Sequence, residues 1–181
     1  MQLTEEEKRT LIDIAKTTIE CRLAGMSIPE FRIDTEVLKE KSGAFVTLKK
    51  SGHLRGCIGY IEAKNPLYKT VEQMAIAAAF NDPRFPPLKR DEVKHVTIEI
   101  SVLSKLKEIK DINEIEIGIH GIYIVKGFYS GLLLPQVASE YKWDKITFLE
   151  ETCYKAGLHK SAWRDKDTKI YIFSADVFTQ H

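Results

Sequence analysis

The residues best suited to chemistry in this chain are Arg55 and Cys57, two positions apart in the sequence Leu-Arg-Gly-Cys-Ile-Gly at 54–59. On an extended strand alternate side chains share a face, so both would point the same way, with Gly59 next along. A guanidinium near a thiol favours the thiolate, which is the reactive form. The missing side chain at Gly59 leaves space for a ligand or another backbone. The segment therefore has the pattern of a site carried by a strand.

The sequence leaves three interpretations of Cys57 open. The first is a structural one, in which the thiol packs as a small buried hydrophobe. In the second, Cys57 is a nucleophile or covalent carrier assisted by Arg55 and His53, although no partner base is evident. In the third, the segment is a binding surface, where Arg55 binds an anionic group and the backbone of a partner approaches Gly56 and Gly59.

A hairpin must position these residues. From residue 43 the apolar pattern has a period of two, which predicts strands over 45–49 and 54–61 with a tight turn at 50–53. Arg55 then lies on the second strand just past the turn. If Arg55 has a structural role and not a functional one, we expect it to form an ion pair with a carboxylate such as Glu62 or Glu99.

A second group of polar residues lies in the segment Phe-Asn-Asp-Pro-Arg-Phe-Pro-Pro-Leu at 80–88. Its prolines hold the loop extended, which lowers the entropic cost of presenting Asp82 and Arg84. Phe85 and Leu88 would anchor the loop in the core, and a purely structural lid over a sheet has the same pattern. If the loop folds back over the hairpin, Asp82 and Arg84 meet Arg55 and Cys57 in one cleft.

The remaining elements predict an α+β fold, with a mostly antiparallel sheet flanked by helices. Thr4 and Glu7 form a capping box that starts a helix running to about residue 23. Asn65 and Pro66 are expected to open a second helix that ends at residue 80. Further strands are expected at 96–102, 115–119, 122–125 and 169–173, and further helices at 136–141 and 145–156. The charged segment 105–111 could mark a change of sheet or subdomain within a single domain spanning 1–181.

Composition excludes several classes of protein. Lys and Arg number 27 against 26 for Asp and Glu, so the basic excess typical of nucleic-acid-binding proteins is missing. No apolar run suggests a signal peptide or a membrane span. The three cysteines are too few for a disulfide framework, which favours the reducing cytosol. We therefore expect a cytoplasmic protein without a membrane partner. A third interpretation, an adaptor that faces RNA or DNA, stays open but is disfavoured by the balanced charge.

The familiar motifs of cofactor and metal sites are absent from the sequence. It has no phosphate-binding loop, dinucleotide fingerprint, CxxC, HExxH or GxSxG pattern. None of its five histidines lies at metal-ligand spacing from another. The sequence thus gives no support for a metal or a cofactor, but this does not exclude catalysis.

Five motifs in order along the chain resemble the AMMECR family. They are the hexapeptide at 54–59, the segments 80–88 and 99–104, the segment 131–138 with Trp143 and Asp144, and the segment 153–158. The resemblance implies an α+β protein with a larger and a smaller subdomain and the hexapeptide near a cleft between them. It implies no settled activity.

The resemblance also implies a possible protein partner. Prokaryotic members are often encoded with, or fused to, a dioxygenase-like domain and a radical-SAM enzyme, which suggests a modification pathway. This chain lacks the radical-SAM cysteine triad and would not be the radical enzyme itself.

The leading hypothesis is a site built on Cys57 and Arg55 as candidate catalytic residues, with Gly56, Gly59, Asp82 and Arg84 as candidate binding residues. In it, Cys57 is the nucleophile of a thiol-dependent enzyme, or the chain is an accessory component of a modification pathway. The alternative is a non-catalytic binding or scaffold module that recognises a protein partner or a small anion with the same residues.

Overall fold

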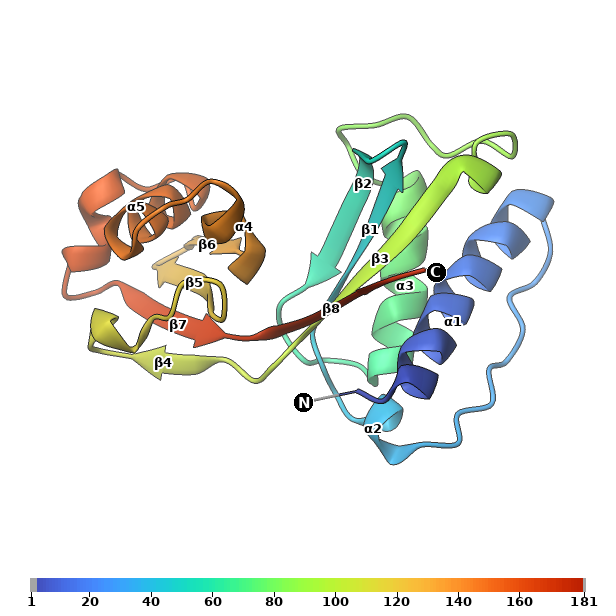
Figure 1. Cartoon of the computed structure of the whole chain (residues 1–181), viewed down its shortest axis with the longest axis horizontal. Helices are drawn as coiled ribbons and strands as arrows, with labels where there is room; N and C mark the ends of the chain where they lie inside the picture. The colour runs from blue at the N-terminus through green and yellow to red at the C-terminus, as the bar shows by residue number, and fades with distance from the viewer. Residues whose placement is uncertain (1–2, 181) are drawn as a thin grey trace. The chain divides into compact units, whose positions relative to one another are not determined.

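The computed structural model describes residues 3–180. The chain divides into two compact units: residues 3–103 together with 176–180 form the first, and residues 104–175 form the second. Each unit has a four-stranded sheet of its own (Figure 1).

The sheet of the first unit has the strand order β2-β1-β3-β8. Its strands are β1 (Ala44–Lys50), β2 (His53–Tyr60), β3 (Val96–Leu103) and β8 (Ala175–Thr179). The strand β1 pairs antiparallel with both β2 and β3. The strand β2 therefore lies at one edge, with one side of its backbone free of strand partners.

A two-residue turn joins β1 to β2. Ser51 and Gly52 both have positive φ, 51° and 78°, as the hairpin turn whose twist matches that of the strands requires. Just past the turn the register shifts, because Leu48 faces Gly56 whereas Lys49 faces Leu54. Arg55 is thus the additional residue of a β-bulge, and strict alternation does not hold between Arg55 and Cys57.

Helices α1 (Glu5–Ala24) and α3 (Leu67–Phe80) pack against one face of this sheet (Figure 1). The helix α1 starts at the capping box of Thr4 and Glu7 and ends at Gly25, whose φ is 73°. The helix α3 is apolar on most sides because it packs between α1 and strands β1 and β2. A short helix, α2 (Glu36–Lys39), precedes β1.

The second unit has the strand order β4-β7-β5-β6. Its elements are β4 (Lys107–Ile109), η2 (Ile112–Glu114), β5 (Gly121–Lys126), β6 (Tyr129–Leu133), α4 (Pro135–Glu140), α5 (Lys145–Lys155), η3 (Lys160–Arg164) and β7 (Lys169–Phe173). Phe148, Leu149 and Cys153 of α5 are fully buried in the core of this unit. Burial also raises the pKa of the Cys153 thiol.

The α+β class and the antiparallel pairing are confirmed, and three local expectations need correction. The second helix begins at Leu67 with Pro66 as its N-cap, one residue later than expected, because the sequence predicts Asn65 as the N-cap and Pro66 as the first helical residue. The segment 115–119 is not a strand: residues 117–119 form a turn, in which the carbonyl of Glu116 accepts hydrogen bonds from the N–H groups of Ile119 and His120. The short strand β4 and the strand β8 were not expected, since neither has a long alternating pattern. The boundary between the units falls just before the charged segment 105–111.

In residues 3–180, no helix combines the length and hydrophobicity needed to cross a membrane.

Candidate functional site

Cys57 lies on the edge strand β2 with its backbone turned away from β1. Its cross-strand partner is Thr47. The N–H of Cys57 donates to Asp82 Oδ2 at 2.8 Å, and its carbonyl accepts from Arg84 Nη2 at 3.1 Å. Both backbone groups thus bond outside the sheet, so Cys57 and Thr47 form a pair without mutual backbone hydrogen bonds. Side chains are closest in pairs of this kind.

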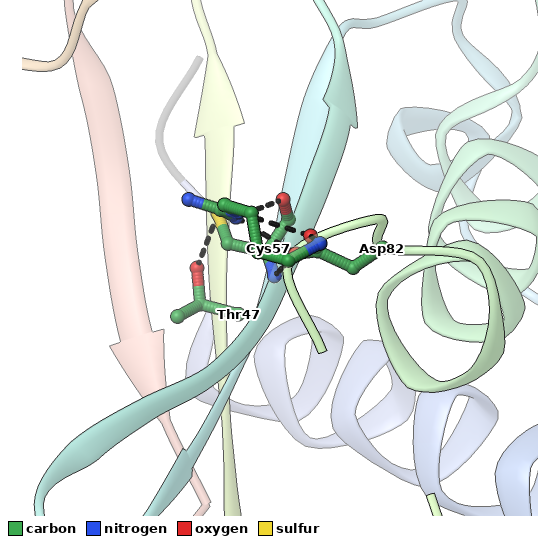
Figure 2. Close-up of polar contacts among 4 residues, drawn as sticks. Thr47, Cys57 and Asp82 are labelled. Atoms are coloured by element: carbon green, nitrogen blue, oxygen red, sulfur yellow. Dashed lines mark hydrogen bonds and ion pairs between the residues drawn. The ribbon is translucent and has the colours of Figure 1, made fainter. Parts of the chain in front are cut away.

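Asp82 and Arg84 substitute for a neighbouring strand at this point. The Arg84 guanidinium also pairs with both carboxylate oxygens of Asp82, Nε with Oδ1 at 3.0 Å and Nη2 with Oδ2 at 2.7 Å. Asp82 further accepts the backbone N–H of Arg84 at 3.1 Å, as a turn-forming aspartate does. The loop after α3 is therefore fastened to the free edge of β2 (Figure 2).

The carboxylate of Asp82 is charged and buried. Only 2% of its side chain is exposed, whereas 53% of the Arg84 side chain is exposed. The hydrogen bonds from Arg84, followed by the backbone N–H of Cys57, hold the pKa of Asp82 well below its usual range against the opposing effect of burial. A buried carboxylate with this many donors fixes the backbone around it.

The thiol of Cys57 is half-buried and contacts a hydroxyl. Thr47 Oγ1 lies 3.1 Å from Cys57 Sγ (Figure 2). Among residues 3–180, this hydroxyl is the one polar group that forms a hydrogen bond with the sulfur. Among residues 3–180 no base forms a hydrogen bond with the thiol, and His53, considered as an assisting group, is exposed at the start of β2.

Arg55 pairs with a carboxylate that the sequence analysis did not single out. Its Nε and Nη2 donate to the two oxygens of Glu92 at 3.2 and 2.9 Å. The two carboxylates expected from the sequence pair elsewhere, Glu99 with Lys49 and Glu62 with Lys64. The ion-pair interpretation of Arg55 is therefore correct in kind, but its partner is Glu92.

Glu92 connects three segments of the first unit. Besides Arg55, it accepts from Lys50 Nζ at 3.0 Å and from the backbone N–H of Lys89 at 3.2 Å. These donors, Arg55 first and then Lys50, lower the pKa of Glu92 to about 2. The pair is largely sheltered, since the Arg55 and Glu92 side chains are 10% and 15% exposed.

Phe85 lies between the two arginines. Its ring centroid is 6.0 Å from Cζ of Arg55 and 5.6 Å from Cζ of Arg84, distances at which a cation is attracted to an aromatic face. The loop therefore links the Arg55–Glu92 pair with the Asp82–Arg84 pair. Nη1 of Arg55 is buried and forms no hydrogen bond with any residue between 3 and 180.

The spaces beside Gly56 and Gly59 are occupied by the protein itself. A Cβ at Gly56 would lie 2.1 Å from the carbonyl oxygen of Ala78 in α3. A Cβ at Gly59 would lie 2.3 Å from the ring of Phe45. Gly56 allows the helix to approach the sheet closely, and Gly59 accommodates a cross-strand aromatic ring.

The structure thus brings Asp82 and Arg84 to the backbone of Cys57, whereas Arg55 turns to Glu92. Thr47 and Glu92 were missed. The cross-strand position of Thr47 follows from the hairpin register, which the bulge at Arg55 obscures. Nothing in the local sequence around Glu92 indicates its partner, since Arg55 lies 37 residues earlier. In the described part of the chain, no three His, Cys, Asp or Glu side chains are grouped so as to share a metal ion.

The fold and site define an α+β protein in which a loop-held cysteine lies on the edge strand of an antiparallel sheet. The chain belongs to the AMMECR1 family, whose model matches residues 12–178. A protein of Methanothermobacter thermautotrophicus is 41% identical, over 97% of this chain and 95% of that protein. One of Methanopyrus kandleri is 44% identical, over 99% and 91%. The crystal structure of an uncharacterised protein from Pyrococcus horikoshii superposes with a TM-score of 0.92 at 38% identity, covering 100% of this chain and 95% of that one.

Proposed function

We propose that this chain is a recognition module that binds a protein partner along the exposed rim of β2, and that Cys57 is not a nucleophile. The proposal rests on one observation: the charged side chains of the site bind other parts of the protein and not the thiol. Asp82 and Arg84 bind the backbone of Cys57, and Arg55 binds Glu92. These groups hold a surface in a fixed shape, and no residue between 3 and 180 forms a hydrogen bond through which it could accept the proton of the thiol.

Thiol catalysis needs a group that removes the proton from sulfur and a second group that orients the base. The described residues offer Cys57 a threonine hydroxyl, which is a donor and no base at neutral pH. The thiol enzyme is therefore the second candidate function. Its support is the partial exposure of Cys57 and the hydrogen bond from Thr47.

Three exposed side chains favour recognition at the rim of β2. Leu54 and Tyr60, toward the two ends of the strand, are 43% and 45% exposed. Arg84, beside Cys57 midway between them, has a side chain that is 53% exposed. A partner that docks sideways on an edge strand meets side chains from both of its faces. The rim fits an apolar segment that carries a carboxylate for Arg84.

The partner to test first is the dioxygenase-like protein that the family resemblance implies. The purified chain is titrated with that protein from the same organism, and the dissociation constant is measured by calorimetry. We expect Leu54→Ser and Tyr60→Ser to weaken binding about tenfold each, and Cys57→Ala to leave it unchanged.

The Cys57→Ala variant is the matched control, because it removes the thiol and leaves the exposed side chains of Leu54, Tyr60 and Arg84 unchanged. Absence of binding by the wild-type chain, or loss of binding in Cys57→Ala alone, would overturn the proposal. The second outcome would direct attention to the thiol.

A further inference from the structure

A hollow that the β2 site does not use lies beside α1 in the first unit. It has a volume of about 400 Å³. Its walls come from the second half of α1, the segment 88–94, the start of β3 and Gln180. All of these segments belong to the same compact unit, so the hollow is a property of that unit alone.

The floor of this hollow is apolar. Ile19, Leu88 and Ile98 are buried at its base, and Val93 and Val96 are half-buried at its sides. Small-molecule sites are typically apolar clefts of about 300–1,000 Å³ with a few polar groups that orient the ligand. The hollow has the size and the floor of such a site.

The rim of the hollow carries an excess of positive charge. Lys16, Arg90 and Lys94 oppose the single carboxylate of Glu20. Arg90 is held in place, because its Nε donates to the carbonyl of Leu23 at 2.8 Å. Within residues 3–180 the two lysines have no carboxylate partner, whereas Lys49, Lys50 and Lys69 of the same unit are paired. The rim therefore complements an anion.

We infer that this hollow binds a small amphipathic carboxylate, with an aliphatic or aromatic body on the floor and the carboxylate between Lys16 and Lys94. The apolar body gains by leaving water, at roughly 25 cal/mol per Å² of buried surface. The carboxylate gains two cations that pair with no carboxylate in the described part of the chain. Neither a bare anion nor an apolar cation satisfies both parts of the site.

A neighbouring hollow of about 370 Å³ shares Lys16 and Gln180 with the first but is less suited to an anion. Its Lys8 already pairs with Glu5 and Asp176 and lies 5.8 Å from the ring centroid of Phe178. It is also lined by Arg9 together with the carboxylates of Glu5 and Asp13, so its three cations face two carboxylates, whereas those of the first hollow face Glu20 alone. This contrast places the carboxylate on the side of Lys94.

The test uses the whole chain and sodium octanoate as the probe. Binding is followed by the shifts of backbone amide signals in nuclear magnetic resonance spectra, with octyltrimethylammonium and inorganic phosphate as the comparison probes. We expect octanoate to bind saturably, with shifts concentrated at residues 16–20 and 93–98. The cation and phosphate should not produce these shifts.

The double variant Lys16→Gln/Lys94→Gln should raise the octanoate dissociation constant about fivefold, consistent with two solvent-exposed charge pairs. Lys41→Gln is the matched control, since it removes one exposed lysine of the same unit outside the hollow, and should leave the constant unchanged. Equal binding of the cationic probe, an unchanged constant in the double variant, or no saturable shift with octanoate would each overturn the inference.

Discussion

Asp82 accepts a hydrogen bond from the backbone N–H of Cys57, 25 residues earlier in the chain, at 2.8 Å. The same carboxylate binds the guanidinium of Arg84, which in turn binds the carbonyl of Cys57. A single buried side chain thus secures both the edge of the sheet and the loop that covers it.

Replacing Asp82 with Ala should lower the free energy of unfolding by about 2–3 kcal/mol, because a backbone N–H and a guanidinium lose their acceptor. Asp82→Asn should cost less, since it retains one oxygen as an acceptor. Urea denaturation measures both changes. Asp91→Asn, at an exposed position, is the control and should be close to neutral. A neutral Asp82→Ala would show that the contact does not stabilise the fold.

Glu92 should make the stability of the protein depend on pH in the acid range. Its pKa in the folded chain is about 2, below the ordinary value of 4.5. A depressed carboxyl pKa stabilises the fold above the unfolded value, and this contribution is lost as the pH falls through the folded value. Glu92→Gln should therefore lower stability by up to about 3 kcal/mol at neutral pH, with the difference shrinking between about pH 5 and pH 2.

The measurement for Glu92 is a series of denaturation curves for wild type and variant across that pH range. Glu62→Gln, which changes an exposed carboxylate paired with Lys64, is the control and should give a small difference at every pH. A Glu92→Gln difference that stays constant with pH would contradict the assignment.

Gly56→Ala should be strongly destabilising, by about 2–4 kcal/mol, because the new methyl group meets the carbonyl of Ala78. The obstacle is helix backbone, which cannot move without shifting α3 away from the sheet. Thr97→Ala, on an exposed position of β3, should cost about 0.5 kcal/mol and serves as the control. Thermal unfolding followed by circular dichroism compares the two, and equal melting temperatures would refute the packing role of Gly56.

The alkylation rate of Cys57 should depend on Thr47 and not on Arg55. In a Cys21→Ser/Cys153→Ser background, Arg55→Met should change the rate with iodoacetamide less than about twofold, because the guanidinium contacts Glu92 and not the sulfur. Thr47→Val should slow alkylation by about two- to fivefold through loss of the hydroxyl donor, and Thr47→Ser should restore it.

The opposite result would revive the thiol enzyme. If Arg55→Met slowed alkylation strongly while Thr47→Val did not, Arg55 would reach the thiol in solution. A substrate search would then begin with anionic electrophiles.

Local elements with strong periodic or capping patterns could be predicted from the sequence. The capping box of Thr4 and Glu7, the left-handed Gly25 and the alternation in β3 depend on neighbours close in the chain, so their patterns are readable. The same holds for the hairpin, whose Ser51–Gly52 turn fixes the pairing of β1 and β2. The motif order also sufficed to indicate the family to which the chain belongs.

Which side chains meet at the site depends on contacts between segments far apart in the sequence, and so could not be predicted from it. The bulge at Arg55 breaks the alternation that would have put its guanidinium beside Cys57, and a bulge has no reliable local pattern. The meeting of Arg55 with Glu92 and of Cys57 with Asp82 joins residues 37 and 25 positions apart, and it depends on how the loop after α3 returns to the edge of β2. The close approach of Ala78 to Gly56 is likewise a packing distance, which depends on α3 and β2 together and cannot be assigned from either segment alone.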